Sequence, residues 1–169
     1  SPGVNDWAQL STGTDQDRFI GEMYVRAFGR DLVEKKNNGD ILELDFNTFT
    51  DDGEAILRIR ETPPIHGGLL GQEGGRLEMS WLEVVMKKGV GTQSGTGVDP
   101  RLYFQGTCDG SDSYSNESEV EIGRLGDSTI KVKWYHAQSF YEAAFRTIGY
   151  DPVLYSMHSA SIGLKFVGE

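Results

Sequence analysis

The stretch that decides the fold runs from Pro100 to Val153 and reads PRLYFQGTCDGSDSYSNESEVEIGRLGDSTIKVKWYHAQSFYEAAFRTIGYDPV. Apolar and polar residues alternate around Leu102 and Phe104, and they alternate again toward Ile122 after a polar turn. Alternation with a period of two is typical of strands that have one buried and one solvated face. Two such strands joined by a turn of Asp, Gly and Ser predict a β-hairpin with a longer loop.

The turn between these strands carries residues that favour a reversal of the chain. Asp109 can bond the backbone of its own turn, and Gly110 can adopt a positive φ there. We therefore expect residues 109–115 to be a structural hairpin tip without activity. The turn resembles a degenerate Asp-box, the hairpin of sialidase-like propellers, at Thr107, Asp109, Ser111, Ser113 and Tyr114.

Other segments on both sides of this stretch also alternate. We expect strands at residues 22–27, 41–46, 55–60, 77–86, 130–134 and 162–167. In residues 130–134 the apolar positions alternate with lysines, which predicts that Trp134 lies in the core. Residues 17–28 also fit helical spacing, but Tyr24, Val25 and Phe28 favour a strand. Residues 141–145 fit a single helical turn.

The composition agrees with a turn-rich β protein. The chain has 169 residues with 22 glycines and 5 prolines, and its turns recur at the spacing of a sandwich or barrel. We expect an all-β fold, an antiparallel β-sandwich, with part of a β-propeller as the alternative. Residues 1–17 are polar except for Trp7 and are expected to be an arm or lead-in. Residues 18–169 are expected to form a single β domain.

The charge and the cysteine content exclude several classes of function. The formal net charge is −10, which argues against a surface that grips nucleic acid by neutralising phosphates. Such a charge suits a solvated surface, or the wall of a conduit that must not hold passing DNA. No stretch has the apolar length of a membrane-spanning helix. Cys108 is the only cysteine, so an internal disulfide is impossible.

Residues that carry chemistry are scattered, and none forms a recognisable site. The glycine-rich segment 87–99 lacks the Gly-Lys-Ser/Thr end of a phosphate-binding loop. Ser156 and His158 are neighbours on an expected strand, which does not make a catalytic triad. We expect no catalytic, cofactor-binding or metal-binding residue, and we expect that the protein is not an enzyme. The candidates weighed and set aside for metals are His66, His136 and His158 for zinc, and Asp99, Asp109 and Asp112 for calcium.

The wider stretch resembles the C-terminal region of the tail hub, or packaged-DNA stabilisation, proteins of short-tailed bacteriophages. The order and spacing match across roughly half of the chain. The Leu-Gly of that family is Ala137-Gln138 here, and an Arg that usually follows is missing. The matching residues are Gly89, Gly91, Gly95, Gly97, Asp99, Pro100, Leu102, Thr107, Asp109, Gly110, Ser115, Glu117, Gly123, Gly126, Val132, Trp134, Phe145, Asp151, Pro152 and Val153.

The resemblance implies a structural protein of the virion, located in the phage tail. Such a protein assembles with copies of itself into a ring that closes or extends the portal-tail channel. Its partners would be other tail proteins, such as the portal adaptor, tail spike or fibre, with no sequence-specific nucleic acid. We expect the contacts between subunits in residues 1–17 and in the loops 67–75 and 87–99. Family members are considerably longer, so the chain is expected to be a piece of a larger protein.

A carbohydrate-binding β-sandwich is the alternative function. Tryptophan and tyrosine rings can stack on sugars when they stand in an exposed row. Such a row would include Trp7, Trp81 and Trp134. The two functions are therefore distinguished by whether these aromatic rings are buried or exposed.

Overall fold

The computed structural model describes residues 10–15, 17–36, 38–111, 113–127 and 130–167. Regular structure in these residues is almost entirely β, and every pair of strands runs antiparallel. The contacts within the chain divide it into an N-terminal unit, Ser1–Leu57, and a C-terminal unit, Arg58–Glu169. The all-β prediction is confirmed, and the described residues close neither a barrel nor a propeller. The division differs from the expected lead-in of residues 1–17 followed by one domain.

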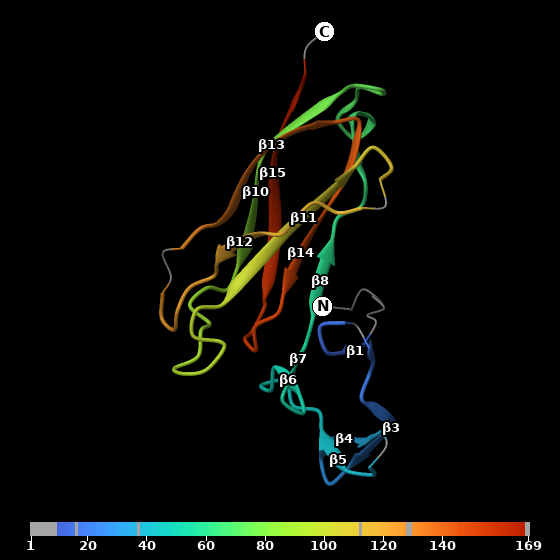
Figure 1. Cartoon of the computed structure of the whole chain (residues 1–169), viewed down its shortest axis with the longest axis vertical. Coiled ribbons are helices and arrows are strands. Elements are labelled where there is room, and N and C mark those ends of the chain that lie inside the picture. The colour runs from blue at the N-terminus through green and yellow to red at the C-terminus, as the bar shows by residue number, and fades with distance from the viewer. Residues whose placement is uncertain (1–9, 16, 37, 112, 128–129, 168–169) are drawn as a thin grey trace. The chain divides into compact units, whose positions relative to one another are not determined.

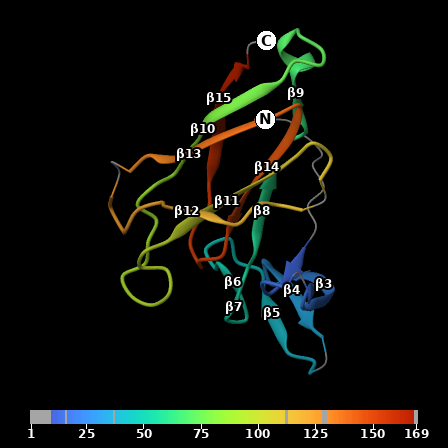
Figure 2. The same ribbon diagram turned by 45° about the horizontal axis from the view of Figure 1, so that its top comes forward.

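Two antiparallel sheets form the C-terminal unit (Figures 1 and 2). The first has the order β13-β10-β15, and its strands are β13 (Val132–Phe140), β10 (Leu77–Met86) and β15 (Met157–Phe166). The second has the order β12-β11-β14-β8, with β9 also paired to β14. Its strands are β12 (Ser118–Glu121), β11 (Arg101–Cys108), β14 (Glu142–Gly149), β8 (Arg58–Glu61) and β9 (Ile65–His66). The short 3-10 helix η1 (Gly67–Leu70) follows β9.

One hydrophobic core lies between the two sheets. It joins residues of β10 and β13 to residues of β11 and β14, which makes this unit a two-layer sandwich. Phe104 lies at its centre, with ring centroids 5.6 Å from Trp134 and 5.7 Å from Phe145. Only 3% of Trp134 is exposed, so its predicted place in the core is confirmed.

A β-bulge lets the central strand β10 face the core along its whole length. Leu77 and Met79 are buried, the register shifts between Met79 and Trp81, and burial then resumes at Leu82. An extra residue at a bulge reverses the alternation, so both halves of the strand turn apolar side chains to the same side. Trp81 lies on the outer face, where Lys133 Nζ is 3.9 Å from the ring centroid. The predicted bounds of this strand are confirmed.

The predicted hairpin in the central stretch is confirmed: β11 and β12 pair antiparallel around the loop 109–117. Asp109 and Gly110 adopt positive φ angles of 53° and 73°. The side chain of Asp109 reaches beyond its own turn. Its Oδ1 accepts hydrogen bonds from the backbone N–H groups of Tyr141 at 2.8 Å and Glu142 at 3.2 Å. Asp109 thus ties the hairpin tip to the turn between β13 and β14.

The N-terminal unit is built from short hairpins. Its main sheet has three strands, β3 (Gly21–Ala27), β4 (Arg30–Lys35) and β5 (Ile41–Glu43). Two further pairs are β1 (Ser11–Thr12) with β2 (Asp17–Arg18), and β6 (Thr50–Asp51) with β7 (Glu54–Ala55). Val33 is the single buried hydrophobic residue among the described residues of this unit.

Some expected elements differ from those observed. Residues 141–145 lie in the turn before β14 and in β14 itself rather than in a helical turn. The strand expected at residues 55–60 is broken, since β7 ends at Ala55 and β8 begins at Arg58. The strand expected at 22–27 is confirmed against the helical alternative. Strand β4 was not predicted. The loop 87–99 contains no strand or helix.

Candidate binding surface

The N-terminal unit contains an open groove of about 820 Å³. Tyr24, Val33 and Leu42 are direct neighbours across β3, β4 and β5, so their side chains share one face of the sheet. This face is the floor of the groove, and its walls come from the chain before and after the sheet. The apolar residues that line the groove are Leu10, Phe19, Ile20, Tyr24, Val33, Leu42, Leu44, Phe46, Ile56 and Leu57.

The polar lining of this groove is acidic. Five acidic residues line it against one basic residue, Arg26, and the acids are Asp31, Glu43, Asp45, Asp51 and Asp52. The charge of the whole chain is concentrated in the same unit. Residues 1–57 carry 12 acidic and 5 basic residues, which contributes −7 to the net charge of −10. We call this site the acidic groove.

Local contacts hold several carboxylates of the acidic groove in place. The Tyr24 hydroxyl donates a hydrogen bond to Asp31 Oδ1 at 2.6 Å, and this bond raises the pKa of Tyr24. Arg26 Nε lies 3.9 Å from the same oxygen. Asp45 accepts hydrogen bonds from the backbone N–H of Asn47 at 3.1 Å and from the Thr48 hydroxyl at 3.3 Å. The rim is therefore ordered by its own turns and strands.

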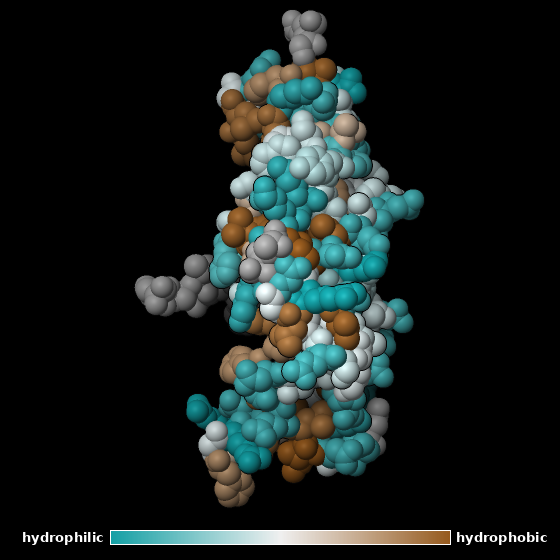
Figure 3. Space-filling model, turned by 90° about the vertical axis from the view of Figure 1, so that its left-hand side faces the viewer, coloured by the Kyte–Doolittle hydropathy of each residue, from teal (hydrophilic) through white to brown (hydrophobic). Residues whose placement is uncertain are grey.

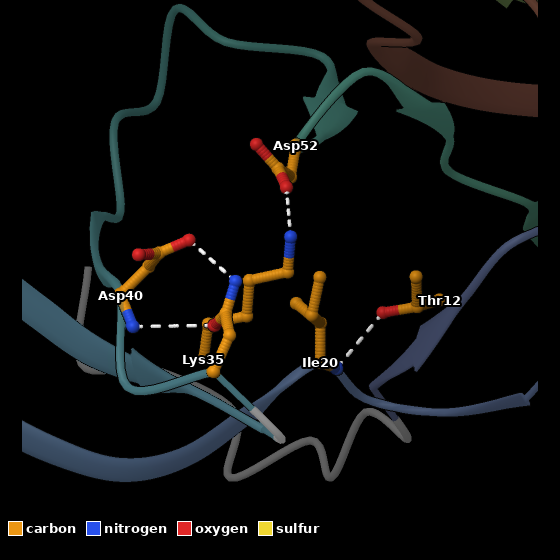
Figure 4. Close-up of polar contacts among 6 residues, drawn as sticks. Thr12, Ile20, Lys35, Asp40 and Asp52 are labelled. Carbon is orange, nitrogen blue, oxygen red and sulfur yellow. Dashed lines mark hydrogen bonds and ion pairs between the residues drawn. The ribbon is translucent and has the colours of Figure 1, made fainter.

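A polar network connects the walls of the groove to its sheet (Figure 4). Lys35 Nζ pairs with the carboxylate of Asp52, and this hydrogen bond raises the pKa of Lys35. Thr12 Oγ1 accepts a hydrogen bond from the backbone N–H of Ile20 at 3.0 Å and donates one to Asp51 Oδ2 at 3.1 Å. These contacts hold the segments around Thr12 and Asp52 together with little help from apolar burial.

Apolar side chains are also exposed outside the groove. Met23, Val25 and Ile41 lie on the opposite face of the β3-β4-β5 sheet and are more than half exposed. Phe28, in the turn between β3 and β4, is 98% exposed. Figure 3 shows apolar side chains reaching the surface between polar ones.

Within the described residues, the candidate calcium ligands Asp99 and Asp109 bond other groups. Asp99 is paired with Arg124, whose Nε and Nη2 both donate to it. Asp109 bonds two backbone N–H groups, and Asp112 lies outside the described residues. His136 Nε2 contacts Gln138 Oε1 at 2.7 Å. Within the described part of the chain, no group of three or more His, Cys, Asp or Glu residues could hold a metal ion.

The aromatic rings weighed for sugar binding do not form an exposed row in the described structure. Trp134 is buried, and its indole Nε1 donates to the Ser118 carbonyl at 2.9 Å. Trp81 is half-buried, with the Lys133 ammonium over its ring. Trp7 lies outside the described residues.

Cys108 has no feature of a reactive thiol. It is half-buried, and burial raises the pKa of its thiol above the usual value. A raised pKa lowers the fraction of thiolate at neutral pH, and the thiolate is the reactive form. The Gln138 Nε2 atom lies 2.7 Å from the sulfur.

The loop 67–75, one of the segments expected to contact other subunits, is exposed over most of its length. It forms η1 and presents Leu69 and Leu70, which are 63% and 50% exposed. Residues 1–9 of the expected arm lie outside the described residues, whereas β1 and the first residue of β2, Asp17, belong to the arm.

Sequence reasoning did not find the acidic groove. The alternation in residues 41–46 identified β5, but β4 was missed, and β4 supplies the floor residue Val33. Phe28 and Gly29 both adopt positive φ, at 54° and 75°, in the turn between β3 and β4. Such turns usually carry Asn-Gly or Asp-Gly, so Gly29 was the one sequence signal for this hairpin.

No helix within the described residues is long and apolar enough to cross a membrane. Comparison with known proteins finds no matching family model and no matching curated protein.

Proposed function

We propose that this chain is part of a structural protein of a bacteriophage virion, a tail hub component that assembles with copies of itself and with other tail proteins. The main support for the proposal is the low burial of apolar side chains in the N-terminal unit. Among its described hydrophobic residues only Val33 is buried, and many others are exposed. A unit of this kind gains stability when a neighbouring protein covers its apolar side chains. Assembly into a larger particle supplies such a neighbour.

The resemblance in the sequence is compatible with the architecture of the C-terminal unit. The residues that resemble the tail hub family fall on β11, β13, β14 and the loops beside them. Several of these residues have structural roles, since Leu102, Trp134 and Phe145 are in the core. A shared pattern of core residues and turns supports a shared fold more directly than it supports a shared partner.

The charge also supports a place beside a DNA channel. Both units are acidic, with a net charge of −7 over residues 1–57 and −3 over residues 58–169. An acidic wall repels phosphates and lets DNA pass without binding. The carbohydrate-binding alternative depended on an exposed row of tryptophans, and the burial of Trp134 counts against it.

Immunogold electron microscopy of virions tests this proposal. Antibodies raised against the whole chain are applied to phage particles purified from the cells that produce it. We expect gold label at the tail of intact particles, and loss of that label when the antibody is first mixed with the free chain. Particles that carry no label, while the chain is found only in the particle-free fraction, would contradict the proposal.

A further inference from the structure

We propose that the acidic groove binds an extended segment of a partner protein in which apolar side chains are flanked by Lys or Arg. The inference rests on the proposed function for the source of that partner, another tail protein. The chemistry of the segment follows from the groove itself.

The floor of the groove selects an apolar side chain. Tyr24 is 61% exposed and Leu42 lies across from it on the same face, with Val33 between them only 4% exposed, and Leu44 is 43% exposed beside this strip. An aliphatic or aromatic side chain placed on this strip removes apolar area from water on both partners, which is favourable by about 25 cal/mol per Å². The volume of about 820 Å³ is enough for several side chains of a peptide.

The rim of the groove selects positive charge. Arg30 Nη1 pairs with Glu43 at 3.2 Å, and Lys35 pairs with Asp52, so part of the acidic charge is neutralised locally. Arg30 and Glu43 alternate with Asp31 and Leu42, so this pair projects from the opposite face of the sheet. The other acidic residues of the lining still outnumber the two bases Arg26 and Lys35; they are Asp31, Asp45, Asp51 and Asp52. A Lys or Arg beside the inserted apolar side chain therefore meets a favourable potential.

The same charges disfavour occupants from this chain. A second copy carries a net charge of −10 and would be repelled by the acidic groove. Residues 1–9 include the apolar Trp7 but no Lys or Arg, so they do not match the rim. Charge complementarity points to a separate, basic partner.

The test is a titration of the whole isotope-labelled chain, followed by NMR, with three synthetic peptides. One alternates Lys and Leu, the second alternates Lys and Ser, and the third alternates Glu and Leu. We expect the Lys/Leu peptide to shift the amide signals of Tyr24, Val33 and Leu42 selectively, with an affinity that falls as salt rises. The other two peptides should bind at least tenfold more weakly, because each lacks one of the two features that the groove selects.

Two matched variants distinguish binding in the groove from non-specific attraction of a basic peptide to an acidic protein. Asp45→Asn removes a charge from the rim and should weaken the Lys/Leu peptide about two- to fivefold, as expected for one exposed charge contact. Glu54→Gln removes the same charge from an exposed position of the same unit outside the groove, so it should leave the affinity unchanged. Equal weakening by both variants would show that the attraction is non-specific and would overturn the proposal.

Other outcomes also overturn it. These are no binding of the Lys/Leu peptide, equal binding of either control peptide, or shifts spread over the whole chain. If Trp7→Ala moves the groove signals without any peptide, residues 1–9 occupy the groove themselves and the proposal is wrong. If the antibody labels phage tails but the groove binds none of the peptides, only this inference is wrong. If the groove binds the Lys/Leu peptide as expected but the chain is absent from virions, only the proposed function is wrong.

Discussion

At the scale of single residues, Trp134 is expected to contribute more to stability than its neighbour. Its ring packs against Phe104 and its Nε1 donates to the Ser118 carbonyl, so Trp134→Ala leaves a cavity and an unpaired acceptor. We expect the free energy of unfolding to fall by about 3–5 kcal/mol. Tyr135→Ala, at a side chain that is 79% exposed, should change it by less than about 0.5 kcal/mol. Urea denaturation measures both, and an unchanged midpoint for Trp134→Ala would place the tryptophan outside the core.

Asp109 is expected to stabilise the fold through its carboxylate without taking part in chemistry. Asp109→Ala removes the acceptor for two backbone N–H groups and places Ala at a positive φ. We expect a loss of about 1–2 kcal/mol in urea denaturation. Asp109→Asn keeps one acceptor oxygen and tolerates the same φ, so its loss should be smaller. If Asn destabilises the chain as much as Ala, these hydrogen bonds are not the cause.

Because of Tyr155, we expect the free energy of unfolding to fall at alkaline pH. Its hydroxyl donates to the Arg101 carbonyl at 2.8 Å, and burial raises its pKa. The unfolded chain releases this proton near pH 10, about the usual value for tyrosine, while the folded chain retains it. The folded state then binds more protons, so the free energy of unfolding falls as the pH rises above about 10.

Urea denaturation between about pH 8 and pH 11 tests this expectation. Tyr155→Phe has no proton to retain, so its stability should fall less steeply with pH than that of the original chain. Tyr135→Phe, at an exposed position, is the matched control and should keep the original slope. Equal slopes for Tyr155→Phe and the original chain would contradict the assignment.

At the scale of elements, Gly163 allows β15 to pair with β10 beneath Trp81. A Cβ atom at Gly163 would lie 2.4 Å from Trp81 Nε1, closer than any real contact of this kind. We expect Gly163→Ala to cost about 1–3 kcal/mol in thermal or urea unfolding. Ser161→Ala, at an exposed position of the same strand, is the control. The double variant Gly163→Ala, Trp81→Ala should lose less than the two single variants together. Additive losses would show that the two residues do not interact.

Elements with a clear alternation could be predicted from the sequence. The bounds of β10 were expected correctly, as was the hairpin of β11 and β12. The phase of β10 could not be predicted, because the bulge near Trp81 depends on its pairing with β13 and β15. The missed strand β4 has only Leu32 and Val33 between charged residues, which is too short for a pattern with a period of two.

At the scale of the whole molecule, the fold class was predictable and the acidic groove was not. The all-β class follows from repeated alternation and turns. The groove combines residues from Leu10 to Leu57 that meet through the pairing of β3, β4 and β5 and through contacts such as Thr12–Asp51 and Lys35–Asp52. The concentration of charge in residues 1–57 is visible in the sequence, but only once the boundary at Leu57 is known. Contacts between segments distant in the chain set that boundary.

We propose that this chain is a subunit of a phage tail, and cryo-electron microscopy of intact virions from the producing cells tests this proposal. We expect density for the β-sandwich repeated in a ring around the tail channel, with the exposed apolar residues of the N-terminal unit covered by a neighbouring protein. A tail that contains no such density would rule out the proposed function, and a ring in which that unit faces only solvent would rule out the proposed mode of assembly.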